Sequence, residues 1–304
     1  MRFSIFQESR KGARKANQDR TSYAYTRDSL LMVVADGMGG HLHGEVASQI
    51  AVQLLTEAFQ REAKPTLADP ADFLQKSILD AHFALGDYAK ARNLVESPRT
   101  TCVACVVQNA MAYWAHAGDS RLYHVREGRI YAQTRDHSRV QMLVDQGRVR
   151  EEAVQAHPDR NKIFNCVGAS ARPQVELSPP TALRSDDTLM LCSDGMWGPL
   201  TGKLIGASLM KNDIMRAIPE LLELAELRAG PECDNLSVVA MTWAGTHTRT
   251  AAGEVSTQTL ALDSISTELG DFSKADDSDL TDAEIERAIH EIREAIRKHT
   301  THKP

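Results

Sequence analysis

The chain has 304 residues, of which 42% are hydrophobic and 25% charged, as is ordinary for a folded protein. Its net charge of −6 and the lack of a basic stripe argue against nucleic-acid binding. No apolar run approaches the ~18–20 residues of a membrane span, and the first residues lack a signal-peptide core. Five cysteines at irregular positions indicate reduced thiols. We therefore expect a cytoplasmic protein with one large domain and an appendage.

The first third of the chain is predicted to contain three strands followed by two helices. Short apolar runs predict strands at 3–8, 22–26 and 30–35. Apolar residues then recur with helical periodicity over 45–62. Asp69 before Pro70 predicts the start of a second helix, which runs to about Arg92, because Asp is a favoured N-cap and Pro a favoured first residue.

The rest of the predicted catalytic region alternates strands and helices in blocks. Strands are expected at 101–108, 111–117, 121–126 and 129–133, two short helices within 138–157, a strand at 188–193, a helix near 210–228 and a last strand at 236–243. Blocks of this kind predict an α+β fold in which helices pack on antiparallel sheets.

Four aspartates stand at the ends of predicted strands: Asp36, Asp119, Asp194 and Asp234. Any one of them alone is most simply a turn residue, since Asp-Gly and Asp-Asn are common turn dipeptides. Together they predict carboxylates that converge at one end of a rigid scaffold, where divalent cations relieve their repulsion. Oxygen ligands favour Mg²⁺ or Mn²⁺, and no Cys/His set has zinc spacing.

Six segments, in order, carry a resemblance to a known family. They are Asn17-Gln18-Asp19-Arg20, Asp36-Gly37-Met38-Gly39-Gly40, Gly118-Asp119-Ser120-Arg121, Asp136-His137-Ser138, Cys192-Ser193-Asp194-Gly195 and Asp234-Asn235-Leu236-Ser237-Val238-Val239. The chain resembles the metal-dependent serine/threonine protein phosphatases (type 2C, or PPM), most closely the bacterial branch. The resemblance covers roughly residues 1–243 and implies a four-layer α-β-β-α sandwich of two antiparallel sheets, with a catalytic domain at 1–244.

The resemblance also implies a site for two core ions, Mn²⁺ or Mg²⁺. Asp36 is expected to bridge both ions, with Gly37 contributing its carbonyl oxygen. Asp194 and Asp234 are expected to complete one ion, and Asp19 to act through water.

A third, labile ion is expected to lie between Asp119 and Asp194. The implied reaction is hydrolysis of phosphoserine and phosphothreonine in proteins by a water that bridges the core ions, without a phosphoenzyme. The implied partners are phosphorylated proteins and a serine/threonine kinase whose action the chain reverses.

Two further residues are candidates for the chemistry. Arg14 lies five residues before Asp19, the family's offset for a phosphate-binding arginine, although the basic run at 10–15 also fits a solvated surface. Eukaryotic members often have a histidine where this chain has Met38, so the proton donor to the leaving oxygen is open. His41 and metal-bound water are the candidates.

Another departure from the family pattern is Ser97-Pro98-Arg99-Thr100-Thr101, where Met-Gly-Thr-Thr is usual. Arg99 there is expected either to alter the site or to have no effect.

Two rival functions have weaker support in the sequence. Cys166 and Arg172 satisfy the Cys-x5-Arg spacing of a cysteine-dependent phosphatase, but Asn165 and Ala169 stand where that family has His and Gly. A scaffold that binds phosphopeptides without turnover would be indicated by loss of a metal carboxylate, and all are present.

Two segments outside the sandwich have predictions of their own. Residues 138–172 resemble the flap of bacterial members, which either selects substrates or is an ordinary helical excursion. Residues 245–280 are predicted to be a flexible linker. Residues 281–304 contain a capping box, Thr281–Glu284, before a narrow isoleucine stripe, and predict an amphipathic helix. That helix is expected to dock on its own domain, self-associate or bind a partner.

Overall fold

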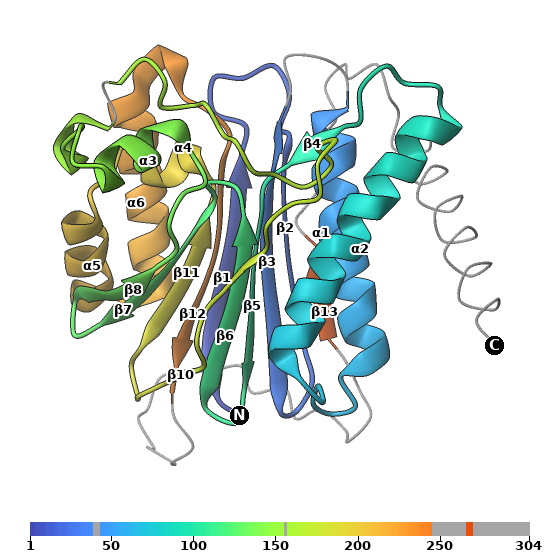
Figure 1. Ribbon diagram of the computed structural model, residues 1–304. Helices are drawn as coiled ribbons and strands as arrows, with labels where there is room; N and C mark the ends of the chain where they lie inside the picture. The colour runs from blue at the N-terminus through green and yellow to red at the C-terminus, as the bar shows by residue number, and fades with distance from the viewer. Residues whose placement is uncertain (39–42, 155–156, 245–265, 270–304) are drawn as a thin grey trace.

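The computed structural model describes residues 1–38, 43–154, 157–244 and 266–269 of the chain. Two antiparallel sheets lie face to face, and helices cover the outer face of each (Figure 1). The first sheet, in spatial order, is β1 (Phe3–Arg10), β12 (Leu236–Trp243), β11 (Thr188–Cys192), β7 (Arg121–Arg126) and β8 (Arg129–Gln133). The predicted α+β, four-layer sandwich is confirmed.

The second sheet contains the strands on which three of the predicted metal residues lie, Asp19, Asp36 and Gly37. Its order is β10 (Thr181–Ala182), β6 (Met111–Ala117), β5 (Cys102–Gln108), β3 (Ser29–Met38), β2 (Asp19–Tyr25) and β13 (Ser266–Leu269), with β4 (Arg99–Thr100) paired to β3 and β9 (Glu176–Leu177) paired to β6. The predicted strands at 111–117, 121–126, 129–133 and 236–243 match their observed bounds, and the others are displaced or extended at their ends.

Three hydrophobic cores separate the four layers. Along β3, Leu31, Val33 and Ala35 face the core under the helices, whereas Leu30, Met32 and Val34 face the core between the sheets. Both faces of this strand are buried, which explains why its sequence is a continuous apolar run and does not alternate. A strand held from both sides fixes the position of the residues at its end.

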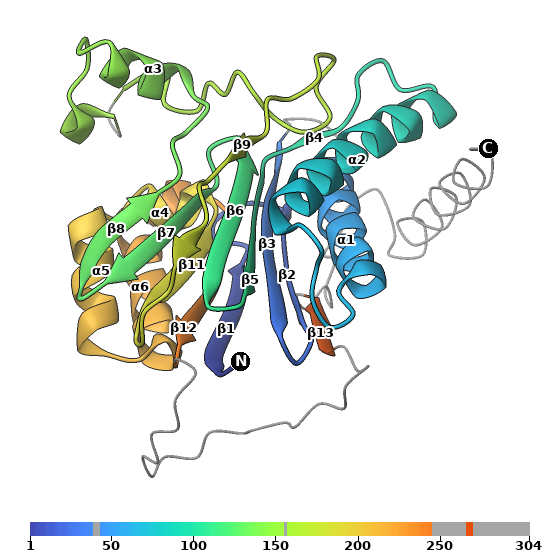
Figure 2. The same ribbon diagram turned by 60° about the horizontal axis from the view of Figure 1, so that its bottom comes forward.

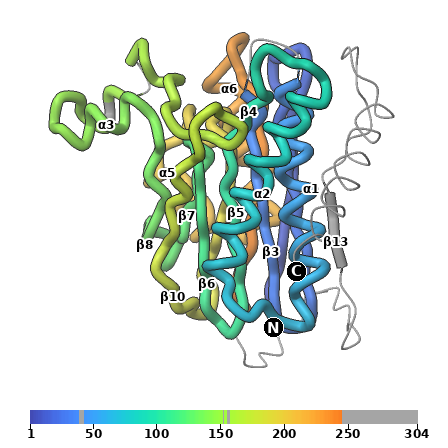
Figure 3. Tube along the Cα trace, turned by 45° about the vertical axis from the view of Figure 1, so that its right-hand side comes forward, coloured from blue at the N-terminus to red at the C-terminus, as the bar shows by residue number. Residues whose placement is uncertain are grey.

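Helices α1 (Gly44–Glu62) and α2 (Pro70–Ala91) pack over the second sheet and lie side by side (Figure 3). The predicted cap of α2 is confirmed: the Asp69 side chain accepts hydrogen bonds from the backbone N–H groups of Ala71 and Asp72. The first sheet is covered by α4 (Asp194–Trp197), α5 (Gly202–Lys211) and α6 (Ile214–Ala229), and a 3-10 turn (Gly230–Glu232) follows.

The single helix predicted near 210–228 is wrong at its start. Helix α5 ends at Lys211 and α6 begins at Ile214, with Asp213 between them as an N-cap whose side chain accepts from the Arg216 N–H. An N-cap aspartate requires non-helical backbone at its own position, so the chain breaks there.

The segment predicted as a flap contains α3 (Arg139–Asp145) and a 3-10 turn (Glu151–Ala153), and it projects beyond the sheets (Figure 2). A bridge between Ser138 and Ile163 closes the projecting part before the end of the predicted segment at residue 172. Within the predicted linker, Ser266–Leu269 forms β13 and pairs with β2. The rest of 245–280, the helix predicted at 281–304 and His41 lie outside the described residues. No described helix has the length and apolar character needed to cross a membrane.

Candidate metal centre

Five aspartates from separate parts of the chain meet at one end of the sandwich. Asp19 and Asp36 are cross-strand partners on β2 and β3. Asp194 opens α4 directly after β11, Asp234 precedes β12, and Asp119 lies in the turn between β6 and β7. They lie close enough for the charges of Asp19, Asp194, Asp119 and Asp234 all to raise the pKa of Asp36. The structure thus brings together all the aspartates predicted from sequence.

The cluster disfavours its own negative charge. Burial raises the pKa of Asp194 to about 7, and the charges of Asp234 and Asp19 add to that effect. Burial likewise raises the pKa of Asp19 to about 6, although hydrogen bonds from Ser193 and Ser237 oppose the shift. The pKa of Asp36 lies well above its ordinary value, because of burial and then the charge of Asp19. Carboxylates held in this way require a counter-charge to ionise together.

Two buried oxygens of the cluster have no protein partner in the part of the chain that the structure describes. Asp19 Oδ2 accepts a 2.6 Å hydrogen bond from Ser193 Oγ, whereas Asp19 Oδ1 is buried and unpartnered. Asp119 Oδ1 is also buried and unpartnered. Buried polar atoms normally have partners. Unpaired carboxylate oxygens among like charges fit hard cations, so the residues present suit Mg²⁺ or Mn²⁺.

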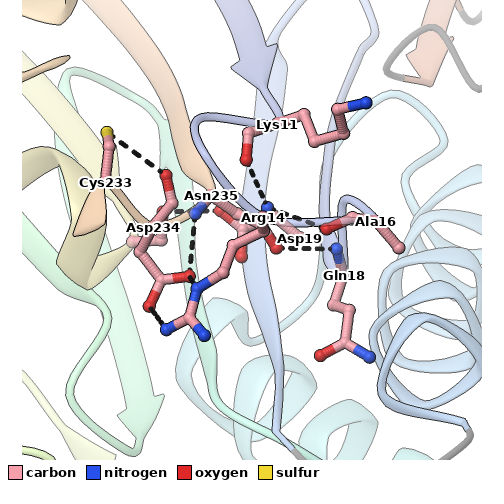
Figure 4. A network of polar contacts seen from close by, with 9 residues as sticks. Lys11, Arg14, Ala16, Gln18, Asp19, Cys233, Asp234 and Asn235 are labelled. Carbon is pink, nitrogen blue, oxygen red and sulfur yellow. Dashed lines mark hydrogen bonds and ion pairs between the residues drawn. The ribbon is translucent and has the colours of Figure 1, made fainter. Parts of the chain in front are cut away.

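Asp234 differs from the rest because it has a basic partner. Arg14 Nε and Nη2 lie 2.7 and 2.6 Å from its two carboxylate oxygens, a bidentate pair at the edge of the cluster (Figure 4). The Arg14 side chain is 56% exposed, so its guanidinium can exchange this partner for another anion without leaving a buried charge behind.

Asn235 fixes the loop that carries Arg14. Its side-chain N–H₂ donates to the carbonyl oxygens of Lys11 and Ala16, and its oxygen accepts from the Gln18 N–H (Figure 4). Sequence reasoning treated Asn235 only as part of a motif. The position of Asn235 directly after Asp234 could have indicated this role, because an Asn side chain provides both the donors and the acceptor that such a loop needs.

Gly37 lies where a side chain has no space. Its N–H donates to the Gln18 carbonyl at 3.1 Å, and an added Cβ would stand 2.2 Å from the Gly44 oxygen. This contact brings the start of α1 against the end of β3. A residue with a side chain therefore does not fit at position 37.

Thr100, on the neighbouring strand β4, and Thr101, which follows it, support Asp36, and neither was predicted to do so. The Asp36 N–H donates to Thr101 Oγ1 at 3.0 Å, and Thr100 Oγ1 donates to the Asp36 carbonyl at 2.8 Å. The segment that departs from the family pattern also places Arg99 beside Met38 in the β3–β4 pair, where Arg99 is exposed and contacts Glu96. The two threonines fix the backbone of Asp36 and leave its carboxylate directed to the cluster.

The rival thiol is in the wrong environment for a nucleophile. Cys166 is 7% exposed, and burial raises its pKa, so the thiolate is disfavoured. His43, at the start of α1, has a left-handed backbone with φ of 103° and stacks edge-on against Tyr88. Among the described residues, neither Cys166 nor His43 has a contact that would make it a catalytic group.

The comparison with family models decides the family. The model described as Protein phosphatase 2C matches residues 7–212. This chain belongs to the protein phosphatase 2C family. Its sequence is 34% identical over 235 residues to the serine/threonine protein phosphatase PstP of Mycobacterium tuberculosis, covering 75% of this chain and 43% of that protein. The chain thus spans less than half the length of this relative.

Other family members agree in sequence and in fold. The chain is 32% identical over 193 residues to the serine/threonine phosphatase stp of Listeria innocua, covering 63% of this chain and 76% of that protein. It superposes with a TM-score of 0.66, at 29% identity, on the catalytic domain of PstP solved with two manganese ions, covering 79% of this chain and 97% of that one. The fold that the resemblance implied is therefore that of solved family members.

Proposed function

We propose that this chain hydrolyses phosphoserine and phosphothreonine in proteins, with Mn²⁺ or Mg²⁺ held by the aspartate cluster. The observation that carries the proposal is the convergence of partly or fully buried aspartates whose pKa values are raised by burial and by one another. Support also comes from the two manganese ions in the PstP catalytic domain. In this proposal Asp36, the Gly37 carbonyl, Asp194 and Asp234 hold the core ions, Asp19 acts through water, and Asp119 with Asp194 holds a third.

When bound, such ions supply Lewis-acid chemistry: they acidify a water and neutralise phosphate oxygens for in-line displacement. The chain's own residues provide the geometry for it. Asp36 and Asp19 are fixed on two paired strands. Thr101 accepts a hydrogen bond from the Asp36 backbone N–H, and Ser193 donates one to the Asp19 carboxylate. Rigid placement of this kind lowers the entropic part of the barrier.

Arg14 is proposed to bind the substrate phosphate. Its planar fork already binds both oxygens of one carboxylate, Asp234, and a phosphate presents a similar pair of acceptors. Cations bound at Asp234 would compete with Arg14 for its oxygens and release the guanidinium towards the phosphate. His41 is retained as the proposed proton donor to the leaving oxygen, with water as the alternative.

The substrates, the opposing kinase and the roles of the outlying segments are proposed from membership of the family. The substrates are phosphorylated proteins, made by a serine/threonine kinase in the cytoplasm of a bacterium. The projecting flap, which has Met142 and Phe164 exposed, is proposed to contact the protein part of the substrate. Residues 245–280 are proposed as a linker, apart from the four residues of β13, and 281–304 as a docking helix.

The direct test is phosphate release from matched peptides that carry phosphoserine, phosphothreonine or phosphotyrosine. We expect release from the first two with Mn²⁺, loss of activity in EDTA, and recovery when Mn²⁺ returns. Turnover that EDTA leaves unchanged would contradict the metal mechanism. Binding of the peptides without any phosphate release would make the chain a phosphopeptide-binding scaffold.

A further inference from the structure

The two ends of the flap meet at His137, outside the aspartate cluster. The His137 carbonyl accepts a 3.0 Å hydrogen bond from the Phe164 N–H, next to the bridge between Ser138 and Ile163. The imidazole is 8% exposed and stacks on His116 with centroids 4.5 Å apart. His137 is thus a buried polar residue at the base of a projecting segment, and the proposed mechanism gives it no role.

The hydrogen bonds of His137 define its protonation pattern. Nδ1 lies 2.7 Å from the Asn165 side-chain nitrogen and accepts from the Gly118 N–H at 3.2 Å. Asn165 cannot be reversed, because its oxygen accepts from the Gln174 N–H and its nitrogen donates to the Gln174 carbonyl. The single lone pair of Nδ1 is therefore shared by two N–H donors, and the ring proton lies on Nε2, 3.2 Å from Glu176 Oε2.

Gly118 is attached to His137 at two points and precedes Asp119. Besides its N–H to the ring, its carbonyl accepts from the His137 N–H at 3.0 Å. Gly118 has φ of 121°, and an added Cβ would lie 2.6 Å from Thr101 Cβ, so a residue with a side chain does not fit at this position. On the other side of the turn, the Asp119 carbonyl accepts from Trp197 Nε1 at 3.0 Å. The backbone on both sides of the Asp119 carboxylate is thus fixed.

An ion pair between Arg121 and Asp136 also connects the start of the flap to the turn that carries Asp119. Asp136, which precedes His137, accepts two hydrogen bonds of 2.7 and 2.8 Å from Arg121. The Arg121 guanidinium lies 3.5 Å from the centroid of the Trp197 ring. The start of the flap therefore contacts residues on both sides of Asp119.

His116, His137 and Glu176 also invite comparison with a metal site, since their ligand atoms lie within 4.8 Å of one another. The rings argue against a shared ion. A metal lies in the plane of an imidazole that binds it, whereas these two planes are stacked with only 12° between them. His116 Nε2 moreover donates to the Arg135 carbonyl at 2.7 Å. The cluster is therefore a hydrogen-bonded support.

We propose that His137 is a positioning residue that couples the flap to the third metal site. Its Nδ1 holds the Gly118 amide, and through it the Asp119 carboxylate, in the place where that carboxylate binds the labile ion. The inference rests on the proposed function for the identity of the ion. It follows that a flap contact which shifts Asn165 or His137 changes the affinity of the third site and leaves the core ions in place.

Two substitutions separate the ring nitrogens. His137→Asn keeps an acceptor near the Nδ1 position, and His137→Gln keeps a polar group near the Nε2 position. Hydrogen exchange at the Gly118 amide and calorimetric titration with Mn²⁺ are measured on the full chain. We expect the Gln variant to lose Gly118 protection and to weaken the third ion by about 10-fold or more. The Asn variant should stay within about twofold of wild type in both. Glu176→Gln, which alters only the Nε2 side, is the matched control and should change neither.

Three results would overturn the proposal. They are a Gln variant with wild-type Gly118 exchange and Mn²⁺ titration, an Asn variant as impaired as Gln, and a wild-type titration that Asp119→Ala leaves unchanged. If His137→Gln does not fold, His137→Ala, which also removes the Nδ1 acceptor, takes its place, and unchanged Gly118 exchange in that variant has the same meaning. Failure of the proposed function is a separate result: Mn²⁺ would bind with the expected pattern, but phosphopeptides would not be hydrolysed.

Discussion

Strand β11 has an aspartate near each end, and the two are in opposite electrostatic states. Asp187, just before the strand, is 1% exposed and accepts from Arg126 Nη2 at 2.6 Å, Arg126 Nε at 2.8 Å and the Arg184 N–H at 2.8 Å. His124 Nε2 lies 3.0 Å away. Hydrogen bonds from Arg126 and His124 hold the pKa of Asp187 well below its usual range, against the effect of burial.

Asp194, just after the strand, has like charges for neighbours in place of cations. Burial, with the charges of Asp234 and Asp19, raises its pKa to about 7. The difference separates a carboxylate that stabilises the fold from one that destabilises it until a cation binds. Carboxylates that have raised pKa values and no cationic partner in the protein are typical of functional sites.

The largest expected effect is the loss of activity when Asp194, the aspartate with like-charged neighbours, is changed. Asp194→Asn should lower hydrolysis of p-nitrophenyl phosphate by roughly 10³-fold, because ligand loss removes several kcal/mol of transition-state stabilisation. The metal-free variant should melt no lower than wild type, since one of the mutually repelling charges is gone. Steady-state kinetics and thermal melts in EDTA measure both. Cys166→Ser is the control and should alter the rate less than about twofold; if it abolishes activity instead, a thiol mechanism is indicated.

Changing Asp187 should have the opposite effect: it should lower stability and leave activity unchanged. Asp187→Asn leaves Arg126 and His124 without their charged partner, so it should destabilise the chain by about 3 kcal/mol. For a domain of this size that lowers the melting temperature by roughly 6–12 °C. Phosphatase activity measured well below the melting temperature should stay near that of wild type. Unchanged stability would show that the Asp187 network offers no net gain over its desolvation.

The pH dependence of stability sharpens the comparison. The folded-state pKa values of about 7 for Asp194 and about 6 for Asp19 exceed the ~3.9 of an unfolded aspartate. The folded metal-free chain therefore binds more protons between pH ~4 and ~7, and these groups make stability fall as pH rises through that window. Asp187 has the opposite sign: its contribution is present above pH ~4 and is lost as pH falls further.

The measurement is the melting temperature in EDTA, taken as the difference between Asp194→Asn and wild type. A difference is needed because burial also lowers the pKa of His116 and His82, whose contributions are lost as pH falls. The variant's advantage should grow from pH 5 to pH 7.5. A difference that is constant over this range would contradict the raised pKa of Asp194.

Sequence predicted the strands and the aspartates well for a physical reason. The apolar runs of β3 and β11 are buried on both faces, and an aspartate after such a run must lie at the end of the sheet. What it did not predict were partners far away along the chain. The pairing of Arg14 with Asp234, the two threonines behind Asp36 and the contact of His137 with Gly118 depend on tertiary packing that no local pattern encodes.

The smallest expected effect concerns the C-terminal segment. A 1–244 truncation removes β13 and exposes the edge of β2 that Ser266–Leu269 covers. It should fold and hydrolyse p-nitrophenyl phosphate normally, but change its oligomeric state or its preference for a phosphoprotein. Light scattering after size exclusion, with kinetics on both substrates, tests this. An insoluble product would show that the segment belongs to the folded core.

The central claim is that the unpaired carboxylates at the end of β11 and its neighbours hold cations, and a thermal melt with Mn²⁺ tests it most directly. Ligand that binds only the folded chain at 100 times its dissociation constant adds about 2.7 kcal/mol of stability. We predict that Mn²⁺ raises the melting temperature of wild type and of Asp187→Asn by a similar amount, and that of Asp194→Asn far less. An equal rise in all three, or none in wild type, would contradict the assignment of the metal centre.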